Sequence, residues 1–86
     1  MPATANRIDV RAIAPSERHP LIFRTFDELP VGGTLEIFFD HDPAPLYFQF
    51  DRARPGQFDW LYVEVEPGKW HVRIARTADG TPGSAA

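Results

Sequence analysis

The possible folds are limited most by the order of two apolar periodicities along the chain, one typical of strands and one typical of helices. Apolar residues alternate with charged or polar ones in residues 7–13 and again in residues 34–39, which is typical of half-buried strands. Elsewhere apolar residues recur at helical spacing, first at Leu21, Ile22, Phe26 and Leu29 and then at Leu46, Phe50 and Ala53. The chain is therefore expected to begin with the order strand, helix, strand, helix.

Prolines, glycines and one aspartate predict the ends of the two helices. Pro20 suits the first position of the first helix, and Gly32 and Gly33 turn the chain after it. Asp42 is expected to cap the second helix, with Pro43 as its first helical residue. Both helices are therefore predicted to have a proline as their first residue.

Two strand-like runs, residues 58–65 and 70–76, complete the chain and flank the predicted loop at residues 66–69. The resulting hairpin register places one apolar set on a single face: Leu61, Val63, Val65, Trp70, Val72 and Ile74. The opposite face is then expected to carry Trp60, Tyr62, Glu64, His71, Arg73 and Ala75. In this register His71 lies opposite Glu64, and the cross-strand pair is sufficient to explain that histidine.

These segments predict an α+β fold of order βαβαββ. The expected architecture is a two-layer α/β sandwich, with a four-stranded mixed sheet and both helices on one face of it. Residues 7–76 form the single predicted domain. Residues 1–6 and 77–86 are small and polar without periodicity, so both are expected to be disordered tails.

Composition excludes several classes of function. The chain contains no cysteine, which excludes disulfides, thiolate metal sites and thiol nucleophiles. It shows no long apolar run and no basic amino-terminal region, so neither a membrane span nor a signal peptide is predicted and the expected location is cytoplasmic. The net charge of −3 and the absence of a basic stripe argue against nucleic acid as a partner.

The predicted topology brings polar residues from two distant turns to one edge of the sheet. The first two strands are joined through a helix and should run parallel, so that their carboxyl ends lie together. The turn after the first strand carries Arg18 and His19, and the turn after the second carries Asp40, His41 and Asp42. We therefore expect these five side chains to form a site at that edge.

Two histidines with one or two aspartates suit a divalent transition metal. In this interpretation His19, His41 and Asp42 are metal ligands, while Arg18 and Asp40 contact a metal-bound cofactor or other ligand. His19 is expected at the start of the first helix, where the helix dipole favours the neutral imidazole that a metal requires. Two alternatives stay open: an anion held by Arg18 and the helix start, or caps and hydrogen bonds with no ligand at all.

The sheet face away from the helices provides a second candidate surface. Phe38, Trp60 and Tyr62 are expected to lie there, beside Arg73. An exposed aromatic patch is typical of a surface that binds a protein partner or a second copy of the chain. This pattern predicts an interaction adaptor as the alternative to a small-ligand module.

Several motifs resemble those of the TusA/SirA sulfur carriers. These motifs are Arg18-His19-Pro20 before a helix, the Gly32-Gly33 turn, and Asp40-His41-Asp42-Pro43 after a strand. The resemblance covers residues 7–76 and implies the same βαβαββ fold, with His19 at the position of the carrier cysteine. Because a persulfide requires a thiol, sulfur-carrier activity is not expected.

The sequence is more specifically similar to an uncharacterised bacterial family in that clan, domain of unknown function 2249. The match is carried by residues 18–23 and 40–46, by Gln49 and Phe50, by residues 54–58, and by the tryptophans at 60 and 70. The resemblance implies association with hemerythrin-like domains and a setting in anaerobic or nitrogen-oxide metabolism. It implies no established reaction.

The sequence therefore predicts a small non-enzymatic binding module that uses His19 and His41. Enzyme activity is the least favoured class, because there is no serine nucleophile arrangement, no phosphate-binding glycine loop and no rigid pair of carboxylates. A histidine acting as an acid–base catalyst beside an aspartate is the only form of catalysis that the pattern leaves open.

Overall fold

The computed structural model describes residues 5–78 and confirms the predicted α+β fold. Its elements are β1 (Ala5–Asp9), the 3₁₀ turn η1 (Val10–Ala12), α1 (Pro15–Asp27), β2 (Thr34–Phe39), α2 (Ala44–Ala53), β3 (Phe58–Glu66) and β4 (Lys69–Arg76). The four strands form one sheet in the order β1-β2-β4-β3. The β1–β2 pair is parallel, as expected for strands joined through a helix, and the other two pairs are antiparallel.

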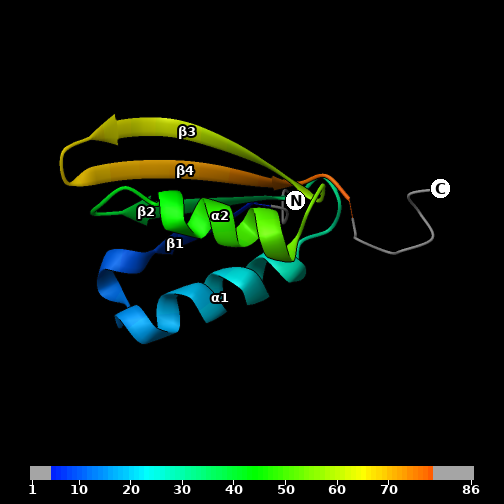
Figure 1. Cartoon of the computed structure of the whole chain (residues 1–86), viewed down its shortest axis with the longest axis horizontal. Coiled ribbons are helices and arrows are strands. Elements are labelled where there is room, and N and C mark those ends of the chain that lie inside the picture. Colours follow the sequence, from blue (N-terminus) through cyan, green and yellow to red (C-terminus); the bar gives the residue numbers. More distant parts are fainter. Residues whose placement is uncertain (1–4, 79–86) are drawn as a thin grey trace.

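Both helices cover the same face of the sheet (Figure 1). Ile22 and Phe26 of α1 and Leu46 and Phe50 of α2 are fully or almost fully buried. They pack in one cluster with the strand residues Leu35, Ile37, Phe39, Val72 and Ile74. The alternation of buried and partly exposed residues along β2 therefore divides the sheet into a helix-covered face and an open face.

The first strand ends earlier than its alternating pattern predicts. β1 stops at Asp9, whose side chain accepts a hydrogen bond from the Arg11 backbone N–H and starts η1. At its other end, Ala5 and Asn6 pair with Thr34 and Leu35, so the predicted amino-terminal tail is wrong for these two residues. Residues 1–4 and 79–86 of the predicted tails lie outside the described residues.

Helix α1 begins at Pro15, not at the predicted Pro20. Both prolines suit a first helical position, and Pro15 takes it, which leaves Pro20 inside the helix without an N–H to donate. Helix α2 begins one residue later than predicted, with Pro43 at the cap position. The prediction that Asp42 is the N-cap residue is therefore wrong, although its carboxylate accepts from the Ala44 backbone N–H at 3.0 Å.

The hairpin contains a bulge that the sequence pattern does not reveal. Pro67 and Gly68 form the turn, and Gly68 has a φ of 75°, which a glycine adopts without strain. Near this turn the predicted register is correct, because Val65 pairs with Trp70 and Glu64 pairs with His71. The register shifts between Tyr62 and Glu64, so the remaining pairs differ from the prediction.

The bulge reverses the expected faces of β3 from its start to Tyr62. Trp60 pairs with the buried Ile74 and Tyr62 with the buried Val72, which places both aromatic side chains on the helix-covered face. Trp60 contacts Tyr47 of α2 with a ring-centroid distance of 5.3 Å. The prediction that Trp60 and Tyr62 share the open face with Phe38 is therefore wrong. The prediction that Leu61 shares a face with Val72 and Ile74 is also wrong, because Leu61 pairs with Arg73. Leu61, Val63 and Val65 lie outside the core, with exposed fractions of 52%, 43% and 52%.

Candidate functional site

Four of the five predicted site residues line one pocket between α1 and the β2–α2 connection. We call this the rim pocket; it has a volume of about 240 Å³ and is lined by Pro15, Arg18, His19, Phe39, His41, Asp42, Pro43, Pro45 and Leu46. Its residues come from two segments about twenty positions apart, which the parallel β1–β2 pair brings to one end of the sheet. The predicted convergence of Arg18, His19, His41 and Asp42 is present in the structure.

Asp40 does not line the rim pocket but contacts it through His41. The Nδ1 atom of His41 lies 2.7 Å from Oδ1 of Asp40. The hydrogen bond from His41 holds the pKa of Asp40 below its ordinary value, with smaller charge effects from His41 and Arg18. An ionised carboxylate can only accept, so Nδ1 of His41 carries the proton and donates it. In the neutral ring, Nε2 is then left as an acceptor or a metal ligand.

Asp42 and Arg18 each use part of their hydrogen-bonding capacity on the protein backbone. Asp42 uses one carboxylate oxygen on the Ala44 N–H, and Arg18 donates from Nε to the Ile13 carbonyl at 2.9 Å. Within residues 5–78, no three His, Asp or Glu side chains are grouped closely enough to hold a metal ion. The rim pocket therefore offers two imidazoles, one of them oriented by a carboxylate, in place of a complete set of protein ligands.

The earlier start of α1 changes the electrostatic setting of His19. The expected position at the helix start would have placed the ring against unpaired backbone N–H groups. With Pro15 as the first helical residue, His19 lies in the second turn, where the effect of the helix dipole has weakened. The predicted position of His19 at the helix start is therefore wrong.

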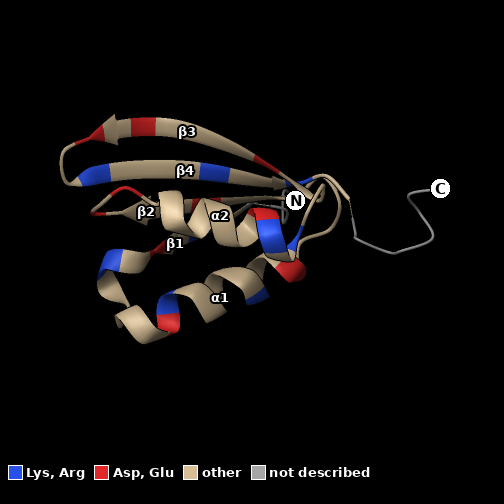
Figure 2. Ribbon diagram, in the orientation of Figure 1, with Lys and Arg blue, Asp and Glu red and all other residues tan. Residues whose placement is uncertain are grey.

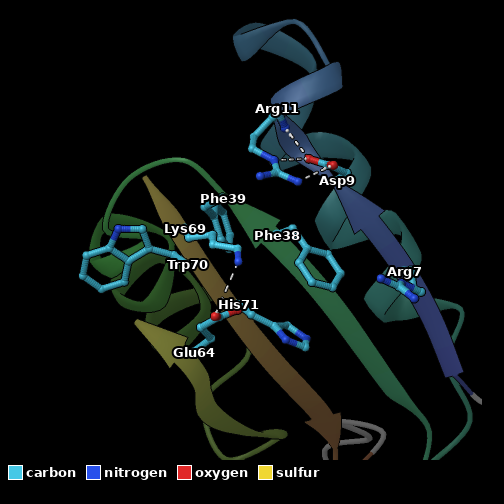
Figure 3. Close-up of a pocket in the computed structure, with 9 residues that line it drawn as sticks. All are labelled: Arg7, Asp9, Arg11, Phe38, Phe39, Glu64, Lys69, Trp70 and His71. Atoms are coloured by element: carbon cyan, nitrogen blue, oxygen red, sulfur yellow. Dashed lines mark hydrogen bonds and ion pairs between the residues drawn. The ribbon is translucent and has the colours of Figure 1, made fainter. Parts of the chain in front are cut away.

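A second and larger pocket, unpredicted from the sequence, lies on the open face of the sheet. We call this the sheet-face pocket; it has a volume of about 390 Å³ and is lined by Arg7, Asp9, Arg11, Phe38, Phe39, Glu64, Lys69, Trp70 and His71 (Figure 3). All four strands or their ends contribute to it. Phe39 lines both pockets, so the two sites adjoin at the carboxyl end of β2.

Three planar side chains form a layer across the floor of the sheet-face pocket. The Arg7 guanidinium lies 4.8 Å from the centroid of the Phe38 ring. The His71 imidazole stacks on the Phe38 ring, with centroids 4.2 Å apart and an angle of 23° between the planes. These groups come from β1, β2 and β4, so the strand pairing fixes their relative positions.

Glu36 fixes the position of the His71 ring in this layer by hydrogen bonding. Its two carboxylate oxygens accept hydrogen bonds from Nε2 of His71 and Nε of Arg73, each at 2.5 Å. Partial burial raises the pKa of Glu36, but the hydrogen bonds from Arg73 and His71 outweigh it and leave the pKa below its ordinary value. The predicted register opposite Glu64 is correct, yet the partner of His71 is Glu36.

The comparison with protein families matches residues 7–76 to the family described as "Uncharacterized conserved protein (DUF2249)". The match spans the described domain from β1 through β4, so the chain belongs to this family. Neither the curated proteins nor the solved structures gave a match. Within the described residues, no helix is long and apolar enough to cross a membrane.

Proposed function

We propose that the protein is a small non-enzymatic module that binds a metal-containing ligand in the rim pocket. The observation that carries this proposal is the meeting of His19 and His41 in one pocket, with Nδ1 of His41 held by Asp40. A carboxylate that fixes one ring nitrogen of a histidine is a recurrent support for metal ligation through the other nitrogen. His19 and His41 are the two ligands that the chain supplies.

Because the chain supplies only two ligands, we expect the metal to be bound as a chelate that provides its remaining ligands. Because residues 5–78 contain no group of three His, Asp or Glu side chains that could hold a metal ion, a bare ion bound by the two imidazoles would complete its coordination with water. A divalent metal in a chelate with two open positions requires only the two imidazoles. Arg18, which also lines the pocket, supplies positive charge for an anionic group of such a chelate.

Untagged protein should bind the nickel complex of nitrilotriacetate, which leaves two coordination positions open, with one complex per chain. Calorimetric titration should show this binding in the unmodified protein and its loss in both His19→Ala and His41→Ala. His71→Gln is the matched control, because His71 lines the other pocket. Binding that survives both rim substitutions, or that is lost only with His71→Gln, contradicts the proposal.

The resemblance to the sulfur carriers adds a proposal about ancestry. We propose that the fold is related to that of the TusA/SirA carriers, with His19 in the place of their cysteine. The chain has no cysteine, so the module carries no persulfide. Association with hemerythrin-like domains and a place in anaerobic or nitrogen-oxide metabolism are proposals that rest on that resemblance alone.

We propose contact between two copies of the chain along β3 as a second candidate function. β3 has only β4 as a neighbour in the sheet, and its exposed residues Leu61, Tyr62, Val63 and Val65 flank this open edge. An exposed apolar edge strand is a site for pairing with another strand. The charges of β3 are all acidic, whereas those of β4 are all basic (Figure 2).

Sedimentation should detect this self-association and its dependence on salt. Leu61→Lys should shift the protein toward monomer, while Val31→Lys, at an exposed valine outside β3, should not. Because two acidic strands repel each other, added salt should strengthen the association by screening that repulsion. A monomer at all concentrations and salt levels, or equal effects of both substitutions, contradicts this candidate.

A further inference from the structure

The charge balance of the sheet-face pocket is positive. Arg7, Arg11 and Lys69 line it against two carboxylates, Asp9 and Glu64. Arg11 pairs with Asp9 at 2.8 Å, and Lys69 lies 3.8 Å from Glu64. Among residues 5–78, Arg7 makes no ion pair, and its guanidinium lies against the Phe38 ring at this pocket.

Arg11 and Lys69 are paired with carboxylates but can still donate hydrogen bonds to a further acceptor. Asp9 accepts from Nε and Nη2 of Arg11, which leaves Nη1 with its hydrogens for another group. The side chains of Lys69 and Glu64 are both exposed and their charged atoms lie far apart for an ion pair, so their attraction is weak. Lys69 can therefore bind another anion with little loss of free energy. All three cations can therefore contribute to binding a single anion.

The floor of the pocket is rigid and partly apolar. Figure 3 shows Arg7, Arg11 and Lys69 on different sides of the Phe38 ring, with His71 beside it. Because Arg7 and His71 cover the two faces of this ring, its edge is the part that remains for contact with a ligand. The edge of an aromatic ring carries positive partial charge, which favours an acceptor or anion as well as apolar contact.

We propose that the sheet-face pocket binds a small organic anion. Its carboxylate or phosphate group lies among Arg7, Arg11 and Lys69, and its apolar part rests against Phe38. The volume of about 390 Å³ falls in the range of pockets that hold small molecules. This site is separate from the rim pocket and does not depend on the function proposed for His19 and His41.

Nuclear magnetic resonance titration of the full chain should locate the anion. Benzoate, acetate and inorganic phosphate are added separately to ¹⁵N-labelled protein, with sodium chloride adjusted to keep the ionic strength constant. We expect saturable shifts of the amides of residues 7–11, 38 and 69–71 with benzoate. Tighter binding of phosphate would assign the anionic group as a phosphate, and tighter binding of benzoate as a carboxylate with an apolar body.

Substitution of the cations decides whether these shifts report a site. Arg7→Gln and Lys69→Gln should each weaken binding by roughly tenfold, because each removes a charge-assisted contact. Arg52→Gln, an exposed arginine of α2, and His41→Ala should leave the affinity unchanged. The proposal is overturned by shifts that do not saturate, by an Arg7→Gln variant that binds as tightly as the unmodified protein, or by shifts confined to the rim pocket.

Discussion

Replacing Phe50 with alanine should lower the free energy of unfolding by about 3–5 kcal/mol. Phe50 is fully buried and contacts aromatic rings from two other elements, Phe23 and Phe26 of α1 and Phe58 and Trp60 of β3. Its loss leaves a cavity where both helices meet the sheet. Because small domains have unfolding free energies of only about 5–15 kcal/mol, the variant should be largely unfolded at moderate temperature.

Phe48→Ala provides the matched control, because Phe48 lies on the same helix with an exposed fraction of 62%. Its substitution removes a similar side chain but little buried surface, so the expected loss is below about 1 kcal/mol. Thermal or urea unfolding followed by circular dichroism measures both variants. Equal losses for Phe48→Ala and Phe50→Ala would show that the two faces of α2 are wrongly assigned.

Glu36→Gln should lower the free energy of unfolding by about 1–3 kcal/mol at neutral pH. The substitution removes a charge that holds His71 and Arg73 on the open face, where the Glu36 side chain is only 16% exposed. Glu66→Gln, at an exposed position of β3, is the control and should have little effect. Urea unfolding of the two variants at pH 7 makes the comparison.

The effect of Glu36 should also depend on pH in a defined direction. The pKa of Glu36 is lower in the folded protein than the ordinary 4.5, so its ionised form is favoured by folding. Its contribution is fully present above pH 4.5 and is lost as the pH falls through the lower folded value. The stability difference between unmodified protein and Glu36→Gln should therefore shrink below about pH 4.5. A difference that grows in that range would contradict the assignment.

The periodicity of the sequence was sufficient to predict the sheet, the two helices and the parallel pair. Local patterns were less informative where two signals of equal strength competed. Pro15 and Pro20 both suit a helix start, and only the path of the chain after η1 selects Pro15. Similarly, alternation through residues 58–65 cannot show the bulge between Tyr62 and Glu64. With the register fixed at the turn, a single extra residue reverses the faces of the side chains from Phe58 to Tyr62.

The rim pocket could be predicted because its residues follow two parallel strands, whose ends meet by topology. The sheet-face pocket could not, because it depends on registers between strands that are distant in sequence. Glu36 and His71 lie 35 positions apart, and their contact requires the β2–β4 register that pairs Phe38 with His71. Charged and aromatic residues that fall on the same face of adjacent strands are the sequence signal for such a pocket.

The proton resonances of the histidine rings will report whether His19 and His41 bind one metal together, as we propose. Paramagnetic nickel, added as its nitrilotriacetate complex, broadens the signals of nearby rings. We predict that the His19 and His41 signals disappear together as one equivalent is added, while the His71 signal is retained. Loss of only one rim signal, or loss of the His71 signal first, would contradict the claim.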